Sequence, residues 1–368
     1  MKIKKLILLL AYCYLSGSIQ AQSLTDQFQH QLDSFYQANP QAVGIIIHVE
    51  APDKNISWTS AAGFAEKNGK EKLSKDQPAL IASITKSYVA VAILRLIEQK
   101  KLVLDQPIKS LISRKSKRAL RKDGYDLEAI TIKHLLSHTS GIQDYVDDDY
   151  IDFIDKNKKH RWSRDEQIAL AVKVGDPLGI AGTIFSYADI NFLLLTEIIE
   201  KQTKKPFYIA IRELIGYEKS GLSSTWFHTL EKTPNNIKPL VHQYWEKQNW
   251  DSYDIDNSFD LYGGGGIAAT TKDVALFFQY LFEGKIIKDE KVLELMHTDI
   301  PLKEPNNYCL GLRKIDFHGY IAYYHGGFWG TDVMYLPALN MTISAVTLQK
   351  DLRDINALLS QELIKILK

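Results

Sequence analysis

The spacing of apolar residues along the chain predicts an ordered series of helices and strands. Apolar residues recur at helical spacing over 24–37, which predicts a helix near the start of the chain. Two β-branched runs, over 43–49 and 56–63, are separated by turn-forming residues, an arrangement typical of a β-hairpin. Residues 83–99 are apolar on nearly every face of a helix, so this helix is expected to be buried.

The middle of the chain has a different pattern from its two ends. Helices are expected there over 130–137, 164–174, 190–202, 206–214, 271–282 and 291–297. Strand patterning returns over 308–348, and a last helix is expected over 354–367. This order predicts an α/β (α+β) fold, in which an antiparallel sheet built from both chain ends is flanked by helices. We expect a sheet lobe of residues 22–105 and 300–368, with an inserted all-helical lobe of residues 106–299.

The first 21 residues have the three-part pattern of a secretory signal peptide. Lys2, Lys4 and Lys5 precede an apolar run over 6–15, and small residues lead to an expected cleavage after Ala21. The apolar run is shorter than the roughly 20 residues of a membrane-spanning helix. An uncleaved anchor is the alternative interpretation. We expect an exported protein, periplasmic or secreted, with no stable membrane insertion after cleavage.

Composition and charge exclude some classes of function. The chain of 368 residues has 45 Lys and Arg against 44 Asp and Glu, so its net charge of +1 would not recruit nucleic acid. Removing 21 residues, with three lysines and no acid, would leave 347 residues with a net charge of −2. Cys309 is then the only cysteine, and the fold must form without a disulfide. We expect residues 22–368 to form a single domain and a monomer.

The pair Ser83 and Lys86 is the first candidate for chemistry. Positions i and i+3 of a helix lie on one face, so the hydroxyl and the ammonium can meet. A buried lysine can have a lowered pKa and then activate a serine hydroxyl. The start of a buried helix also offers N–H groups to a developing oxyanion. The pattern alone is weak, because a serine cap beside a lysine that reaches solvent would look the same.

Further motifs strengthen that interpretation. Six short motifs follow one another at 81–86, 104–107, 131–141, 185–189, 263–267 and 325–327. In this order they resemble the serine β-lactamase and D,D-peptidase superfamily, and within it the class C-like branch. That branch includes D-alanyl-D-alanine carboxypeptidases, D-aminopeptidases and esterases. The resemblance extends over nearly all of the mature chain.

The resemblance implies roles for individual residues. Ser83 would be the acylated nucleophile, and Lys86 its base or proton-relay partner. Tyr187 would shuttle a proton between Ser83, the leaving group and water. A phenol titrates near 10, so Tyr187 could act as a base only if a cation such as Lys86 stabilises the phenolate. The backbone N–H groups of Ser83 and Phe328 would form the oxyanion hole.

Two positions depart from the β-lactamase pattern. Asp189 stands where the family has Asn, and an ionised Asp cannot donate to an amide carbonyl. His325 replaces a lysine with a group that titrates near 6.5 and is mostly neutral at pH 7. Gly326 and Gly327 would let substrate approach the strand. These changes argue against efficient β-lactam hydrolysis and favour esters, or peptides with a free amine that Asp189 and the acidic stretch 144–155 could attract.

Other polar patterns predict no further site. His134 and His138 are four residues apart but have no third metal ligand at a recognisable spacing, so we expect structural roles and no metal. The glycines of 263–266 lack the Lys-Ser/Thr of a phosphate loop and predict a tight turn. The basic cluster 114–122 and the acidic stretch 144–155 are expected to be solvated faces. We expect no cofactor.

These observations predict a serine hydrolase that works through an acyl-Ser83 intermediate. The leading substrate is a D-amino-acid peptide of cell-wall type, cleaved as by a D,D-carboxypeptidase. A carboxylic esterase of the same family is the first alternative. A non-hydrolysing sensor, which binds penicillin but releases the acyl group too slowly for turnover, is the second. The expected partners are small peptides or esters.

Overall fold

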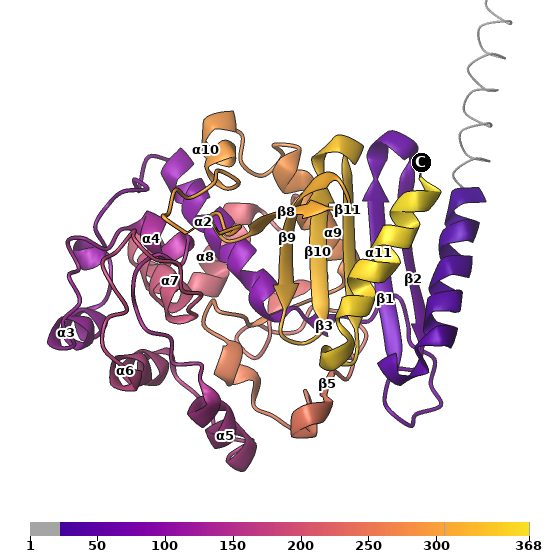
Figure 1. Ribbon diagram of the computed structural model, residues 1–368, viewed down its shortest axis with the longest axis horizontal. Helices are drawn as coiled ribbons and strands as arrows, with labels where there is room; N and C mark the ends of the chain where they lie inside the picture. Colours follow the sequence, from indigo (N-terminus) through magenta and orange to yellow (C-terminus); the bar gives the residue numbers. More distant parts are fainter. Residues whose placement is uncertain (1–22, 305, 368) are drawn as a thin grey trace, which may run out of the picture.

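The computed structural model describes residues 23–304 and 306–367, and the predicted signal peptide of residues 1–21 lies outside them. Figure 1 shows two parts side by side, one built on a sheet and one mainly helical. The helix of residues 23–38 and α11 (Asp354–Ile366) lie next to each other on the sheet side, although they come from opposite ends of the chain. The two chain ends therefore build one part of the molecule.

The sheet has six antiparallel strands in the order β2-β1-β11-β10-β9-β8. Their bounds are Gly44–Ala51 (β1), Ile56–Gly63 (β2), Arg313–Phe317 (β8), Tyr320–Gly327 (β9), Thr331–Leu336 (β10) and Met341–Thr347 (β11). β1 pairs with both its hairpin partner β2 and the distant β11, with Ile45 opposite Thr347. The prediction of an antiparallel sheet closed by both chain ends is confirmed.

Helices cover both faces of this sheet. The helix of residues 23–38 and α11 bury Phe28, Leu32 and Leu359 against one face. On the other face α9 (Thr271–Phe282) contacts β1, β10 and β11. Covering both faces explains why β1 is a continuous apolar run rather than an alternating one. α9 was predicted as part of the inserted lobe, but it packs on the sheet.

The helical part is built around α2 (Thr85–Glu98), which packs against α7 and α8, although its residues were predicted to belong to the sheet lobe. Its other helices are Arg114–Lys122 (α3), Ile132–Leu136 (α4), Asp148–Lys156 (α5), Arg164–Val174 (α6), Ile190–Thr203 (α7), Phe207–Ile215 (α8) and Glu290–Leu295 (α10). The helix predicted to be buried is therefore the centre of this part. No helix within residues 23–304 and 306–367 has the length and apolarity needed to cross a membrane.

The expectation that the inserted lobe is all-helical is wrong. A three-stranded sheet in the order β3-β7-β4 and a two-stranded sheet of β5 and β6 lie in or against it. The bounds are Ala79–Leu80 (β3), Thr225–Phe227 (β4), Tyr244–Trp245 (β5), Trp250–Asp251 (β6) and Ile267–Ala269 (β7). Strands of two or three residues are too short to show an alternating pattern, so the sequence could not reveal them.

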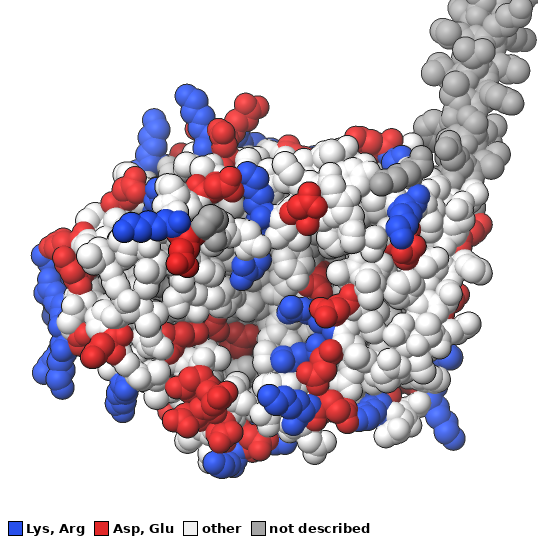
Figure 2. Space-filling model, viewed as in Figure 1, with Lys and Arg blue, Asp and Glu red and all other residues white. Residues whose placement is uncertain are grey.

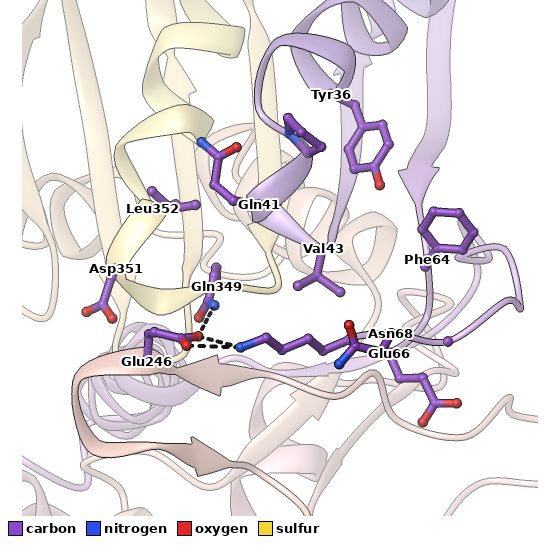
Figure 3. A pocket seen from close by; sticks show the side chains of 13 residues that line it. Tyr36, Gln41, Val43, Phe64, Glu66, Asn68, Glu246, Gln349, Asp351 and Leu352 are labelled. Atoms are coloured by element: carbon purple, nitrogen blue, oxygen red, sulfur yellow. Dashed lines mark hydrogen bonds and ion pairs between the residues drawn. The ribbon is translucent and has the colours of Figure 1, made fainter.

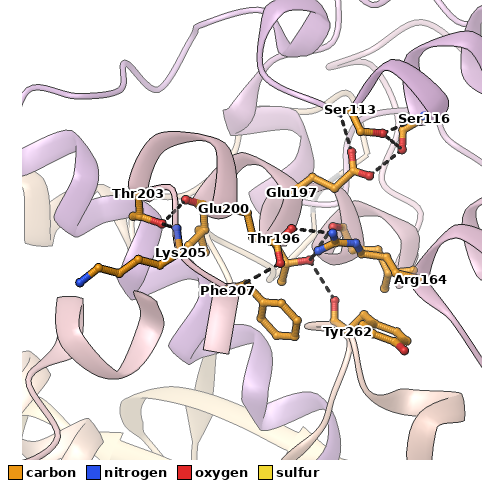
Figure 4. A network of polar contacts seen from close by, with 12 residues as sticks. Ser113, Ser116, Arg164, Thr196, Glu197, Glu200, Thr203, Lys205, Phe207 and Tyr262 are labelled. Carbon is orange, nitrogen blue, oxygen red and sulfur yellow. Dashed lines mark hydrogen bonds and ion pairs between the residues drawn. The ribbon is translucent and has the colours of Figure 1, made fainter. Parts of the chain in front are cut away.

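A polar network fixes the helices of this lobe to the glycine-rich loop of residues 262–266 (Figure 4). The guanidinium of Arg164 donates to Thr196 at 3.1 Å and to Glu200 at 2.5 Å. The Thr196 hydroxyl in turn lies 3.3 Å from the carbonyl oxygen of Tyr262. Glu197, one residue along α7, accepts hydrogen bonds from the start of α3. The network therefore fixes the position of this loop relative to α7. Both the loop and the start of α7 adjoin the cavity described below.

Candidate active site

Ser83 lies in a short 3-10 turn, Ala82–Ile84, between β3 and α2. The residue before it, Ala82, has φ of 45°, a left-handed conformation that costs free energy for any residue with a Cβ. Ala82 and Ile84 are buried, whereas Ser83 is partly exposed. The strained turn therefore anchors its neighbours in the core and presents the hydroxyl to a cavity.

Lys86 is fully buried one turn further along. Its ammonium donates to Ser83 Oγ at 3.1 Å and to the carbonyl oxygen of Gly264 at 2.5 Å, and it forms an ion pair with Asp189 Oδ1 at 2.7 Å. An ammonium has three donors, so this set uses all of them. The predicted meeting of Ser83 and Lys86 is confirmed. Gly264 was not predicted as a partner, because its role depends on a carbonyl group rather than on a side chain.

The charge of Lys86 differs from the expectation. Burial lowers the pKa of Lys86, but the carboxylate of Asp189, with Tyr187 and Asp260, raises it by more, so the net change is upward. Lys86 is therefore an ammonium at neutral pH, and the expected lowered pKa is wrong. The sequence-based argument considered the apolar helix and not the carboxylate that folds against it.

Tyr187 lies beside the pair of Ser83 and Lys86: the Lys86 ammonium is 5.0 Å from the centroid of its ring, and Tyr187 and Ser83 line the same cavity. Its ring packs at a tilt of 32° against that of His138, with ring centroids 4.2 Å apart. Burial raises the pKa of Tyr187, and Asp189 adds to this, while Lys86 lowers it by less. Tyr187 is therefore a neutral phenol in the resting site. The expected cation-stabilised phenolate is wrong for that state, because burial outweighs the nearby ammonium.

The two predicted structural histidines have structural roles. His134 and Thr131 form a capping box at the start of α4. His138 is fully buried, and its Nδ1 accepts from the backbone N–H of Ala188 at 3.1 Å and from Asn191 at 3.2 Å. The carbonyl oxygen of His138 also accepts from the backbone N–H of Ser186 at 2.9 Å, so His138 holds the chain on both sides of Tyr187. No group of three or more potential metal ligands occurs within the described residues.

His325 is 4% exposed and does not line the catalytic cavity. Its Nδ1 donates to the carbonyl oxygen of Gly326 at 2.9 Å, so its Nε2 accepts from the hydroxyl of Tyr308 at 3.2 Å. Burial, followed by the charge of Lys86, lowers the pKa of His325 to about 3. The expectation that it titrates near 6.5 is wrong, and the residue is neutral throughout the working pH range. Its contact with substrate stays a prediction.

Gly327 packs tightly against the turn that carries Ser83. A Cβ on Gly327 would lie 2.3 Å from the carbonyl oxygen of Ile81 and 2.2 Å from Thr331 Oγ1. Strand β9 therefore touches the serine-bearing turn at this point, and contact of Gly327 with substrate stays a prediction. The next residue, Phe328, lines the cavity. The backbone N–H groups of Ser83 and Phe328 donate to no acceptor within residues 23–304 and 306–367, and they remain the predicted oxyanion hole.

Replacing Gly327 by Ala is expected to lower the free energy of unfolding by about 2–3 kcal/mol, because the new methyl group meets backbone. Gly175→Ala is the matched control. Its nearest new neighbour would be Gln143 Cγ at an ordinary 3.7 Å, and it should change stability by less than about 1 kcal/mol. Urea unfolding of both variants measures this. Equal stabilities would contradict the packing role assigned to Gly327.

The cavity beside Ser83 has a volume of about 330 Å³. Its lining residues are Ser83, Asp144, Val146, Tyr150, Ile151, Tyr187, Asp189, Phe259, Asp260 and Phe328. Three of them are aspartates and none is Lys or Arg, so the charged part of the wall is acidic. The remaining wall is mainly apolar or aromatic. Asp260 was missed by the sequence analysis because no motif or spacing sets it apart in the polar stretch before the glycines.

Two of these aspartates have strongly shifted ionisation. Burial raises the pKa of Asp144 to about 8, with a further contribution from the charge of Asp189. Burial and Asp189 likewise raise the pKa of Asp260 to about 8. Asp189, by contrast, faces the Lys86 ammonium directly. At neutral pH the resting cavity therefore holds one ion pair and two largely protonated carboxyl groups.

A larger cavity of about 700 Å³ lies elsewhere, between the end of the 23–38 helix, the loop after β2 and residues 349–352 (Figure 3). Lys67 is among its lining residues and forms an ion pair with Glu246 at 2.8 Å. Its lining contains no serine, cysteine or threonine. It is therefore not the place for acyl transfer, and the smaller cavity at Ser83 is the candidate active site.

Comparison with known proteins agrees with this geometry. The family model described as Beta-lactamase matches residues 32–359. The chain belongs to the β-lactamase family. In this chain, the motif that contains Ser83 and Lys86 and the motif that contains Tyr187 are far apart in the sequence and meet at one cavity.

Individual relatives are distant. Penicillin-binding protein 4* of Bacillus subtilis (strain 168) is 23% identical over 312 residues, which cover 79% of this chain and 64% of that protein. Esterase EstB of Burkholderia gladioli is 32% identical over 125 residues, 34% of this chain and 31% of that protein. The chain thus spans less than two thirds of these curated relatives. The crystal structure of D-amino acid amidase from Ochrobactrum anthropi SV3 with L-phenylalanine has a TM-score of 0.76 at 21% identity, covering 93% of this chain and 98% of that one.

Proposed function

We propose that this member of the β-lactamase family is a serine hydrolase that cleaves D-amino-acid amides and peptides through an acyl-Ser83 intermediate. The observation that carries the proposal is the convergence of Ser83, the Lys86 ammonium and the Tyr187 phenol at one cavity. Two backbone N–H groups without acceptors, on Ser83 and Phe328, adjoin the same cavity. A nucleophile, a proton relay and an oxyanion site are the parts that acyl transfer requires.

The protonation states suggest how the relay works. Ser83 Oγ bonds to the carbonyl carbon while its proton passes to the Tyr187 oxygen, and Tyr187 passes its own proton to the leaving nitrogen as the C–N bond breaks. No free phenolate accumulates, and the Lys86 ammonium stabilises negative charge on both oxygens during transfer. A water molecule then attacks the ester, giving a proton to Tyr187 while Tyr187 returns one to Ser83.

The finer choice of substrate rests on two kinds of support. The name of the structurally similar amidase gives D-amino acids as its substrates. The apolar wall of the cavity suits an apolar acyl side chain. An esterase is the second candidate, favoured by Asp189, which cannot donate to an amide carbonyl.

An active-serine probe followed by substrate kinetics tests the proposal. A fluorophosphonate should label the wild-type protein at Ser83, located by peptide mass spectrometry, and should not label Ser83→Ala. D-phenylalanine p-nitroanilide should then be cleaved at least about tenfold faster than its L isomer. Absence of label on the wild type would reject the acyl-serine mechanism. Turnover of p-nitrophenyl esters alone would indicate an esterase, and permanent acylation by penicillin without turnover of any substrate would indicate a sensor.

A further inference from the structure

Three aspartates from three separate elements meet at the catalytic cavity. Asp144 lies in the loop after α4, Asp189 precedes α7, and Asp260 ends a short 3-10 turn, Asn257–Asp260. Lys86 is the cation whose charge acts on all three, and it is already paired with Asp189 at 2.7 Å. If all three aspartates were ionised, they would exceed this ammonium by two negative charges. Among residues 23–304 and 306–367, Asp144 and Asp260 therefore have no cation of their own.

The hydrogen bonding of these two carboxyl groups also indicates that each has unused capacity to accept a donor. Oδ1 of Asp144 accepts from the backbone N–H groups of Asp189 at 2.9 Å and Tyr145 at 3.0 Å, and its second oxygen is not used there. Oδ1 of Asp260 is buried and has no hydrogen-bond partner within the described residues. A buried carboxylate oxygen without a donor is costly and uncommon. A ligand that brings N–H donors and positive charge would remove that cost.

The missing side chain of Gly265 leaves the space that the carboxyl group of Asp260 occupies. A Cβ on Gly265 would fall 2.1 Å from one carboxyl oxygen of Asp260, so only a glycine can adjoin it. Gly264, the preceding residue, accepts the Lys86 hydrogen bond. The glycine-rich loop thus holds the catalytic lysine and the unpartnered carboxyl group against the same cavity.

We infer that Asp144 and Asp260 form a subsite for the free amino group of a substrate, so that the protein acts at an unblocked amino terminus. This inference rests on the proposed function and narrows its substrate class. In an amino-acid amide, the α-nitrogen is about 2.5 Å from the carbonyl carbon that Ser83 attacks. An ammonium held by the two carboxyl groups would therefore bring that carbon to the nucleophile. Its three N–H donors suit two carboxylates, and the apolar wall would receive the side chain.

The surface outside the cavity favours the same substrate charge. Two residues of α5, Tyr150 and Ile151, line the cavity. The same helix carries four aspartates, Asp148, Asp149, Asp152 and Asp155. Figure 2 shows acidic side chains gathered around the position of α5. The acidic stretch, expected to be a solvated face, thus also borders the entrance. Such a field attracts cations and repels a free carboxylate.

A terminal carboxylate has less to bind here. The lining contains no Lys or Arg, and His325 is neutral and buried. Arg313 lies behind the Tyr308 ring, 5.2 Å from its centroid, and is bonded to Asn307 at 2.6 Å. The predicted D,D-carboxypeptidase activity needs a cation that binds the substrate's carboxylate. Arg313 is the candidate for that cation, so a test of this activity must include a variant of Arg313.

Kinetics with a matched substrate pair test the inference. D-phenylalanine p-nitroanilide has the free amine, and 3-phenylpropionyl p-nitroanilide lacks only that group. The ratio of their kcat/KM values should be about 100 or more in the wild type. It should fall by about tenfold or more in Asp260→Asn and in Asp144→Asn, since each variant removes one acceptor that would ionise when the ammonium binds. The amide introduced by Asp144→Asn retains an oxygen acceptor for the two backbone N–H groups, so that variant should fold.

Asp152→Asn is the control, because it removes an exposed carboxyl group from α5 that does not line the cavity, and it should keep the wild-type ratio. Thermal melting verifies that each variant is folded. A ratio near one in the wild type, or ratios unchanged in both Asp144→Asn and Asp260→Asn, would overturn the inference. So would faster cleavage of N-acetylated peptides ending in D-alanine, lost in Arg313→Gln. Because fluorophosphonate labelling of Ser83 does not depend on the amine, it separates failure of the subsite from failure of the proposed function.

Discussion

Lys86→Met is expected to slow acylation of Ser83 by at least about 10³-fold, because the ammonium that stabilises negative charge on Ser83 and Tyr187 is lost. The same change leaves Asp189 with an uncompensated charge in a largely buried position. Breaking one partner of a buried pair costs about 3–5 kcal/mol, so the free energy of unfolding should fall by that order. Stopped-flow labelling with a fluorophosphonate and urea unfolding measure the two effects.

The double variant Lys86→Met with Asp189→Asn separates stability from catalysis. Removing both charges eliminates the unpaired carboxylate, so most of the lost stability should return. Acylation should stay slow, because no cation is restored. If Lys86→Met acylates within tenfold of the wild-type rate, the ammonium is not part of the relay. If the double variant regains activity together with stability, the loss in the single variant reflected unfolding alone.

Asp260→Asn is expected to stabilise the protein at pH 8 by about 1–3 kcal/mol, and this gain should vanish near pH 4. Burial, followed by the charge of Asp189, raises the pKa of Asp260 from 3.8 to about 8. The folded protein therefore binds a proton that the unfolded chain releases between those values. The stability contributed by protonated Asp260 is fully present below pH 4 and is lost as pH rises through 8. An asparagine does not titrate and avoids that loss.

Thermal melting from pH 4 to pH 8 measures this difference. Asp152→Asn, which changes an exposed side chain, should follow the wild-type curve within about 0.5 kcal/mol. The melting curves of wild type and Asp260→Asn should separate progressively above pH 5. Curves that stay parallel over the whole range would show that Asp260 does not hold a proton in the folded protein.

The two predictions concern the same charged cluster, in which one residue stabilises the fold and another destabilises it. Lys86 stabilises the fold because it compensates Asp189, whereas Asp260 destabilises the fold at neutral pH because it has no such partner. A residue that costs stability and lines a catalytic cavity is a candidate for function. The inferred amine subsite assigns that function to Asp260 and provides the missing cation from the substrate.

The sequence alone determined the order and type of the longer elements and pointed to Ser83 as the candidate nucleophile. Apolar periodicity is local, so it revealed the β1–β2 hairpin, the buried helix at 85–98 and the strands near the end of the chain. The spacing of Ser83 and Lys86 is also local, because both lie within one helical turn. The motif around Tyr187 was recognisable by resemblance and meets them in the folded chain.

Only the tertiary structure decided the charge states and the shape of the site. Ionisation depends on burial and on charges that are distant in sequence, so Asp189 could reverse the expected pKa shift of Lys86, and burial could keep His325 neutral. No motif or spacing in the sequence marks Asp260, and only the fold places it beside Gly265 and the cavity. The sequence therefore identified which residues could react, and the packing of distant segments set the protons that they hold.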